Sequence, residues 1–217
     1  MKRMMKSKRP FTLFAAGATL AVAATASADM IYFESSSANS TEGLGSFGGS
    51  LLFDAGGSTH GTLAITLSNT TDPSIGGYLT GLLFNFSAPN DVSVTLNNGG
   101  HFGDIAGRSA PPFGNNYRAG AAIGNHWTGG GAPHRGIAAG NSLSLNFDVT
   151  GNDVSSLSSA SFFSPSDPFD FVVRFRGMAQ GGSDKVPATA NAAEVPAPGA
   201  LALFGAALRA GRRRRRA

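Results

Sequence analysis

The sequence has 217 residues, enough for one folded domain with short appendages, and a formal net charge of +4. Eleven of the 17 basic residues lie in the first nine and the last nine positions, whereas all 13 acidic residues fall between Asp29 and Glu194. This central stretch holds six basic residues and a net charge of −7, which argues against a nucleic-acid partner. Cysteine is absent, so disulfide bonds, thiolate metal sites and cysteine nucleophiles are excluded.

Residues 1–28 have the three parts of a secretory signal peptide. A basic stretch precedes the largely apolar segment Phe11–Ala24, and Ala26 and Ala28 then place small side chains where signal peptidase requires them. At ~1.5 Å per residue the apolar segment spans about 21 Å, too short to anchor in a hydrocarbon core of about 30 Å. We therefore expect a helix that inserts transiently, export by Sec-type machinery, and a mature protein that begins at Asp29.

Alternation of apolar and polar residues predicts β-strands in the central stretch. The pattern is clearest in Thr62–Ser68 and in Ser142–Val149, where every second residue is apolar. Turns rich in Gly, Asn and Asp separate these two segments from six weaker candidates: Ile31–Phe33, Leu51–Phe53, Leu79–Phe86, Val92–Leu96, Ala160–Phe163 and Phe171–Phe175. Eight short strands predict an all-β domain over residues 29–185, an antiparallel β-sandwich that is jelly-roll-like or immunoglobulin-like in outline.

Two arginines lie in the last of these predicted strands. Arg174 and Arg176 alternate with Val173 and Phe175, so both arginines are expected on the solvent face. We expect them to lie opposite an acidic residue of a neighbouring strand, such as Asp148, in exposed ion pairs worth less than ~1 kcal/mol.

Residues 99–140 are rich in Gly, Asn and Pro and show little periodicity. A connection of that length is uncommon in a compact domain and is the first place to look for a binding surface. Tyr117, His126 and Trp127 lie in this stretch among several asparagines. Aromatic faces beside amides suit sugar binding, so these three residues are candidate glycan contacts. The alternative is that the aromatic rings fold back over one end of the core.

The sequence carries no pattern that indicates catalysis. Gly43–Gly48 matches Gly-x-Gly-x-x-Gly, but a strand-like segment follows it where a nucleotide site needs a helix. The four histidines lack the spacing of a compact metal site, and the acids Asp167, Asp170 and Asp184 do not form a calcium-loop pattern. We therefore expect no enzymatic activity, with no catalytic residues, metal site or cofactor.

The C-terminal segment repeats a three-part order after a polar spacer at residues 186–194. Two prolines hold the motif at 195–199 extended, because Pro fixes φ and disfavours the α region for the residue before it. The apolar stretch Leu201–Leu208 would form a short hydrophobic helix in lipid, with the following arginines on the cytoplasmic side. The motif comprises Val195, Pro196, Ala197, Pro198 and Gly199, and the basic stop comprises Arg212, Arg213, Arg214, Arg215 and Arg216.

Residues 195–217 resemble the PEP-CTERM sorting tail of bacterial exported proteins, which consists of a Val-Pro-x-Pro motif, a short hydrophobic helix and an arginine cluster. Ala197 stands where that family usually has Glu. The resemblance implies recognition by a membrane-embedded exosortase and delivery to the cell surface or the extracellular matrix.

The leading hypothesis is an exported, exosortase-sorted surface or matrix protein without catalytic activity. Its membrane contact would be transient and confined to the terminal segments. The alternative is a carbohydrate-binding module that acts through residues 99–140 on an extracellular polysaccharide, and a secreted hydrolase is a weaker alternative. Nucleic acid is not an expected partner.

Overall fold

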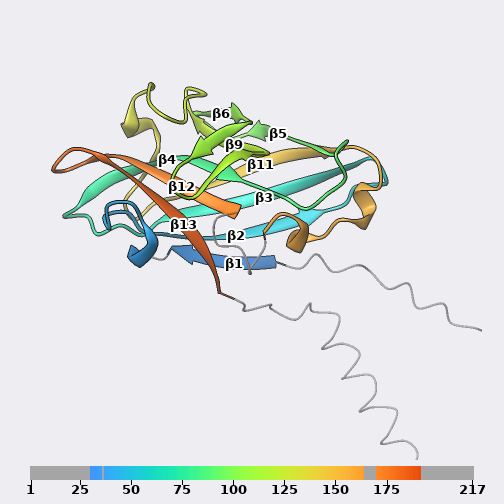
Figure 1. Ribbon diagram of the computed structural model, residues 1–217, viewed down its shortest axis with the longest axis horizontal. Coiled ribbons are helices and arrows are strands. Elements are labelled where there is room, and N and C mark those ends of the chain that lie inside the picture. The colour runs from blue at the N-terminus through green and yellow to red at the C-terminus, as the bar shows by residue number, and fades with distance from the viewer. Residues whose placement is uncertain (1–29, 36, 164–169, 192–217) are drawn as a thin grey trace, which may run out of the picture.

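The computed structural model describes residues 30–35, 37–163 and 170–191, which form an antiparallel β domain (Figure 1). The predicted signal peptide, sorting tail and their two flanking helices lie outside these residues. In the described part of the chain the helical elements are 3₁₀ turns of three residues: η1 (Ser37–Asn39), η2 (Pro133–Arg135), η3 (Val154–Ser156) and η4 (Ser159–Ser161). No helix within that part has the length and apolar character needed to cross a membrane.

The strands vary from two to ten residues in length. In chain order they are β1 (Met30–Ser35), β2 (Phe47–Asp54), β3 (His60–Asn69), β4 (Gly76–Phe84), β5 (Ser93–Asn98), β6 (Phe102–Ile105), β7 (Arg108–Ala110), β8 (Gly114–Tyr117), β9 (Ala119–Ile123), β10 (Ile137–Ala138), β11 (Ser142–Thr150), β12 (Phe171–Met178) and β13 (Ser183–Asn191).

The two clearest predicted strands are confirmed as β3 and β11. They pair antiparallel, with Leu145 opposite Ile65 and Phe147 opposite Leu63. Their apolar side chains are buried on one face, while the polar side chains between them point outward and pair across the strands, as in the hydrogen bond between the hydroxyls of Ser68 and Ser142 at 2.7 Å. The alternating sequence therefore sets the register, because a shift of one residue would turn every leucine toward water.

Ten strands form one continuous antiparallel path in the order β5-β11-β3-β2-β1-β13-β12-β4-β9-β6, and β10 pairs with β4 beside it. The path folds over at β13, which pairs with β12 through residues 183–187 and with β1 through residues 188–191. Figure 1 shows this orange-red strand running obliquely across the domain from β12 to β1.

The two ends of the path approach each other and nearly close the sheet. The backbone N–H of Leu96 in β5 donates to Oδ1 of Asp104 in β6 at 2.7 Å. The all-β antiparallel class predicted from the sequence is thus confirmed. Where the sequence predicts a sandwich of two sheets, the structure has a single barrel-like sheet, because β13 belongs to both layers.

The interior of this barrel-like sheet is packed with phenylalanine rings from both layers. Phe33 of β1 lies 4.6 Å from Phe171 of β12 between ring centroids, and Phe84 of β4 meets Phe147 of β11 edge-on at 5.4 Å. Side chains of this size bury roughly 150–250 Å² each, so they supply much of the hydrophobic stabilisation in a domain without disulfides.

Three local predictions differ from the structure. Ala160–Phe163 is not a strand: it overlaps η4, whose capping box at Ser158 and Ser161 favours a helical turn, and Phe162 and Phe163 then enter the core. The stretch 99–140 is not an unstructured loop, because it contains β6 to β10. Residues 186–191, assigned to the spacer, belong to β13.

Candidate binding site

A second apolar cluster covers the outer face of the layer formed by β12, β4 and β9. The hairpin β7–β8 and the segment after β9 lie over this face and contribute the outer half of the cluster. Residues 106–118 and 124–131 are therefore a covering layer, and the sheet beneath them, which includes β9, is buried on both sides. The cluster comprises Leu83, Ile105, Ala110, Tyr117, Ala122, Trp127 and Val172.

A tight turn after β9 brings the chain back onto this outer face. Gly124 and Asn125 both have φ of 62°, and the N–H of His126 donates to the carbonyl of Ile123 at 3.4 Å. Two successive positive φ angles are the requirement of a type I′ turn, which Gly and Asn tolerate best. Asn125 also donates through Nδ2 to the carbonyl of Asp104 at 3.3 Å, which ties the turn to β6.

This turn places Trp127 over β4. Its indole ring occupies the space above Gly81, where an added Cβ would lie 3.0 Å from the ring, and its carbonyl accepts a hydrogen bond from Nη1 of Arg174. Tyr117 is fully buried and Trp127 is only 4% exposed. Both aromatic rings fold back onto the domain, which is the alternative that the sequence left open, and neither ring exposes a face on which a sugar could stack. His126, the third candidate, is exposed.

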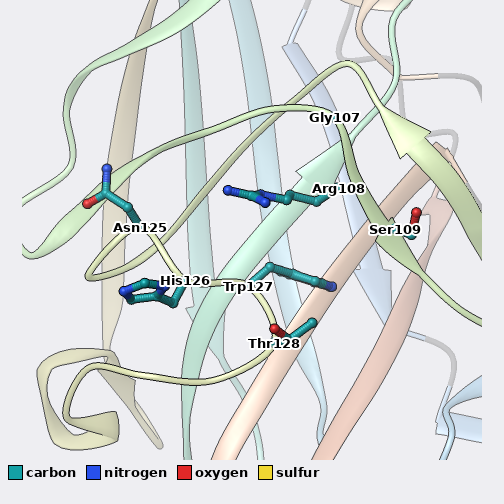
Figure 2. A pocket seen from close by; sticks show the side chains of 7 residues that line it. All are labelled: Gly107, Arg108, Ser109, Asn125, His126, Trp127 and Thr128. Carbon is teal, nitrogen blue, oxygen red and sulfur yellow. The ribbon is translucent and has the colours of Figure 1, made fainter.

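A pocket of about 280 Å³ lies between the start of β7 and the turn that carries Trp127. Figure 2 shows the Arg108 side chain extending from one wall toward Asn125 and His126 on the other. The lining therefore offers guanidinium, imidazole, amide and hydroxyl groups around one edge of a tryptophan. The lining residues are Gly107, Arg108, Ser109, Asn125, His126, Trp127 and Thr128.

A row of three basic side chains lies on the same outer face. Arg174 of β12 is directly opposite Lys185 of β13 in the strand register, and Arg176 follows two residues along β12. Their polar ends contact the covering layer. Lys185 Nζ donates to the carbonyl of Pro111 in the β7–β8 hairpin, and Arg176 Nη2 donates to that of Gly131 at 3.5 Å. We call Arg174, Arg176 and Lys185 the cation row.

The environment of the cation row disfavours its charges. Burial lowers the pKa of Arg174, and the neighbouring charge of Arg176 lowers it further. Burial also lowers the pKa of Lys185, with Arg174 acting in the same direction and Asp184 in the opposite one. Within the described residues, Nε of Arg174 is buried and has no hydrogen-bond partner. The row is thus partly desolvated and not fully compensated by the protein.

Asp148, the acidic residue expected opposite Arg174 and Arg176, does not lie near them. Asp148 lies in β11, in the other part of the sheet, where its carboxylate accepts from Nδ2 of Asn97 at 3.0 Å. Arg174 faces Lys185 instead. To predict the residue opposite Arg174, one must know that β12 pairs with β13, and the alternation within a single strand does not show which strand is its neighbour.

Asp184, the acid nearest the cation row along the chain, is directed to the other side of the sheet and is fully buried. Its carboxylate accepts four hydrogen bonds of 2.8–2.9 Å from Thr41 Oγ1 and the backbone N–H groups of Glu42, Leu44 and Gly45. Burial acts to raise the pKa of Asp184, but these hydrogen bonds outweigh it and hold the pKa below its ordinary value.

The glycine-rich segment at 43–48 thus supplies backbone N–H groups, those of Leu44 and Gly45, to the buried carboxylate of Asp184. A side chain at Gly45 would collide with the ring of Phe175, since an added Cβ would lie 2.4 Å from it. The segment therefore serves folding rather than nucleotide binding. The described residues contain no group of three or more His, Asp or Glu side chains placed to hold a metal ion.

Sequence reasoning placed Arg174 and Arg176 in exposed ion pairs rather than in a site, and it missed Arg108 and Lys185. One signal was available: residues 105–147 contain no Asp or Glu, although the central stretch as a whole is acidic. The predicted cleavage residues Ala26 and Ala28, the motif at 195–199 and the arginines at 212–216 lie outside the described residues.

Comparison of the chain with known proteins adds no further assignment. No protein-family model matches it, and neither a curated protein nor a solved structure matches it.

Proposed function

We propose that the chain is an exported protein whose β domain is displayed at the cell surface or in the extracellular matrix and acts without catalysis. The observation that carries this proposal is the order of residues 1–28: a basic stretch, an apolar segment of about 21 Å, and an Ala-x-Ala site before the first strand. An apolar segment of that length is suited to transient engagement by export machinery rather than to permanent anchoring.

The arrangement of the domain supports the proposal. β1 and β13 are antiparallel neighbours, with Tyr32 opposite Asn191, so residues 30 and 191 lie at the same end of the domain. The proposed signal peptide and the proposed exosortase tail at 195–217 therefore connect to one end. A domain attached in this way at the membrane during export would present its remaining surface outward.

Replacement of Ala28 by Leu tests the export step. A bulky residue directly before the cleavage site should block signal peptidase, so the precursor should accumulate about 28 residues longer than the mature protein. The matched control is Ala24→Leu, which lies in the apolar segment and should be processed normally. Immunoblotting of cell fractions is the measurement. Equal processing of both variants, or full-length wild-type protein in the cytoplasm, contradicts the proposal.

A second candidate function, saccharide binding, is favoured by the pocket between β7 and the turn at 124–127. Hydroxyl, amide and imidazole groups converge there from Ser109, Thr128, Asn125 and His126. These are the groups that hydrogen-bond sugar hydroxyls, and a volume of about 280 Å³ is close to the lower end of small-molecule sites, roughly 300–1,000 Å³. Recognition would occur through these polar groups and the edge of Trp127, since the aromatic faces are covered.

A further inference from the structure

The basic residues of the described domain are concentrated on one surface. Six basic residues lie between the two terminal segments. Arg174, Arg176 and Lys185 form the cation row, Arg108 lines the adjacent pocket, and Arg135 lies in η2. Arg118 lies apart, with its guanidinium over the ring of Phe86 and hydrogen-bonded to nearby carbonyls.

Among the described residues, the strand register places no carboxylate directly opposite a member of the cation row. The covering layer, residues 106–118 and 124–131, contains no Asp or Glu. Among strand residues, the register places Gly81, Ala122, Ser183 and the cation row on this face, while Asp184 and Asp104 are hydrogen-bonded elsewhere. A domain that is acidic overall therefore presents one positively charged surface.

The like charges of the cation row destabilise the fold, so the retention of three cations side by side needs a physical reason. Like charges directly opposite in an antiparallel pair are destabilising, and Arg174 and Lys185 are such a pair. Burial and the charge of Arg174 lower the pKa of Lys185 and outweigh the negative charge of Asp184, which acts to raise that pKa. The carbonyls of Trp127, Pro111 and Gly131 accept some of the N–H groups but carry no net charge to offset the row. A bound anion would supply the missing negative charge.

We propose that the cation row and the adjacent pocket form a binding site for an anionic saccharide, with the carboxylate or sulfate group of the sugar on Arg174, Lys185 and Arg108. This inference rests on the proposed saccharide binding in the pocket and names the class of sugar. Guanidinium groups bind oxyanions through paired N–H donors, and a lysine adds a point charge. The hydroxyl and amide groups of Ser109, Thr128 and Asn125 are then placed for the sugar hydroxyls.

A nucleic acid fits this surface less well. The central stretch has a net charge of −7, which repels an extended phosphate backbone, whereas a short acidic sugar meets only the local positive surface. A pocket of about 280 Å³ accommodates a single ring rather than a duplex groove contact.

The test is calorimetric titration of the purified full chain at low salt with four probes: an oligogalacturonate, dextran sulfate, a neutral dextran oligomer and a single-stranded DNA oligonucleotide. We expect binding to one or both anionic glycans that weakens as salt increases, because the contact charges are partly exposed. Carboxylate and sulfate ligands are distinguished by the first two probes. Each of Arg174→Gln, Lys185→Gln and Arg108→Gln should reduce the affinity by roughly tenfold or more.

Matched variants distinguish binding at the cation row from binding through the basic tail. Arg212→Gln/Arg213→Gln removes charge from the predicted tail and should leave glycan affinity unchanged. Arg174→Gln and Lys185→Gln each remove a hydrogen bond to the covering layer, so their affinities count only where the melting temperature stays near that of the wild type. Arg108→Gln, at the wall of the pocket, is the decisive variant.

Four outcomes overturn the inference: loss of binding in the tail variant alone, equal binding to DNA, unchanged affinity in Lys185→Gln and Arg108→Gln, or no binding to either anionic glycan. Binding of the neutral oligomer without the anionic ones overturns the inference but leaves saccharide binding in place. Failure with all glycans removes both, and neither result bears on export, which the Ala28→Leu variant tests separately.

Discussion

Two charged groups in this domain have opposite relations to their surroundings. The carboxylate of Asp184 is buried and meets four donors from Thr41, Glu42, Leu44 and Gly45. The guanidinium of Arg174 is half-buried, lies beside two other cations and leaves Nε without an acceptor in the described structure. The first arrangement stabilises the fold, whereas the second is the kind of local cost that proteins retain at binding sites.

Replacement of Asp184 by Asn should destabilise the domain strongly. The new amide group would face two N–H donors where a carboxylate oxygen now accepts from them, which leaves buried donors unpaired at a cost of about 2–3 kcal/mol. Urea unfolding at neutral pH is the measurement. Asp148→Asn, at an exposed position, is the matched control and should change the free energy of unfolding by less than ~0.5 kcal/mol.

The free energies of unfolding of the wild type and Asp184→Asn should also depend differently on pH. Because the pKa of Asp184 is held below its ordinary value in the folded state, the unfolded chain binds the proton first as the pH falls. The stabilisation is therefore fully present above about pH 4, the region of an unfolded Asp, and decreases below it. Wild type and Asp184→Asn should converge in stability toward low pH. If the difference in free energy of unfolding between wild type and Asp184→Asn stays constant down to the acid transition, the charge of Asp184 does not contribute to stability.

At the scale of elements, the covering layer depends on close contact between a turn and a strand. Gly81 of β4 leaves the space that the Trp127 ring fills. Gly81→Val should displace the ring, with an overpacking cost of about 1–3 kcal/mol. Trp127 is the single tryptophan, so its fluorescence reports the displacement as a shift to longer wavelength. Gly129→Val is the control, because an added Cβ there meets nothing within 4 Å. An unshifted Gly81→Val spectrum would contradict this packing of the ring on β4.

The sequence predicts elements whose pattern is local and fails where long-range pairing decides. The period of two in β3 and β11 identifies both strands and their buried faces, since half-buried strands need that alternation. The hairpin β7–β8 has strands of three and four residues and no such period, because it covers a sheet rather than extending one. The burial of Tyr117 and Trp127 follows from that covering role and is not visible in their spacing.

The sequence predicts the position of the candidate site but not its chemistry. The stretch 99–140 does contain the pocket, and His126 lines it. The cation row is not evident from the sequence, because Arg174 and Lys185 become neighbours only through the β12–β13 register. The absence of acids from residues 105–147 is the one sequence feature that marks the same surface.

At the scale of the whole molecule, a barrel-like sheet separates three regions. Its interior holds the phenylalanine core, one outer face carries the covering layer with the cation row, and one end carries Tyr32 and Asn191 side by side. This separation lets terminal segments engage export and sorting machinery while the charged face stays available to a ligand.

The central claim is that residues 1–28 and the tail serve delivery and are absent from the displayed protein. Intact-mass measurement of the protein recovered from the cell surface or the surrounding matrix tests it most directly. We predict a mass that corresponds to a chain starting at Asp29 and ending within 195–199. Recovery there of a chain that retains residues 1–28 and Arg212–Arg216 would contradict the account.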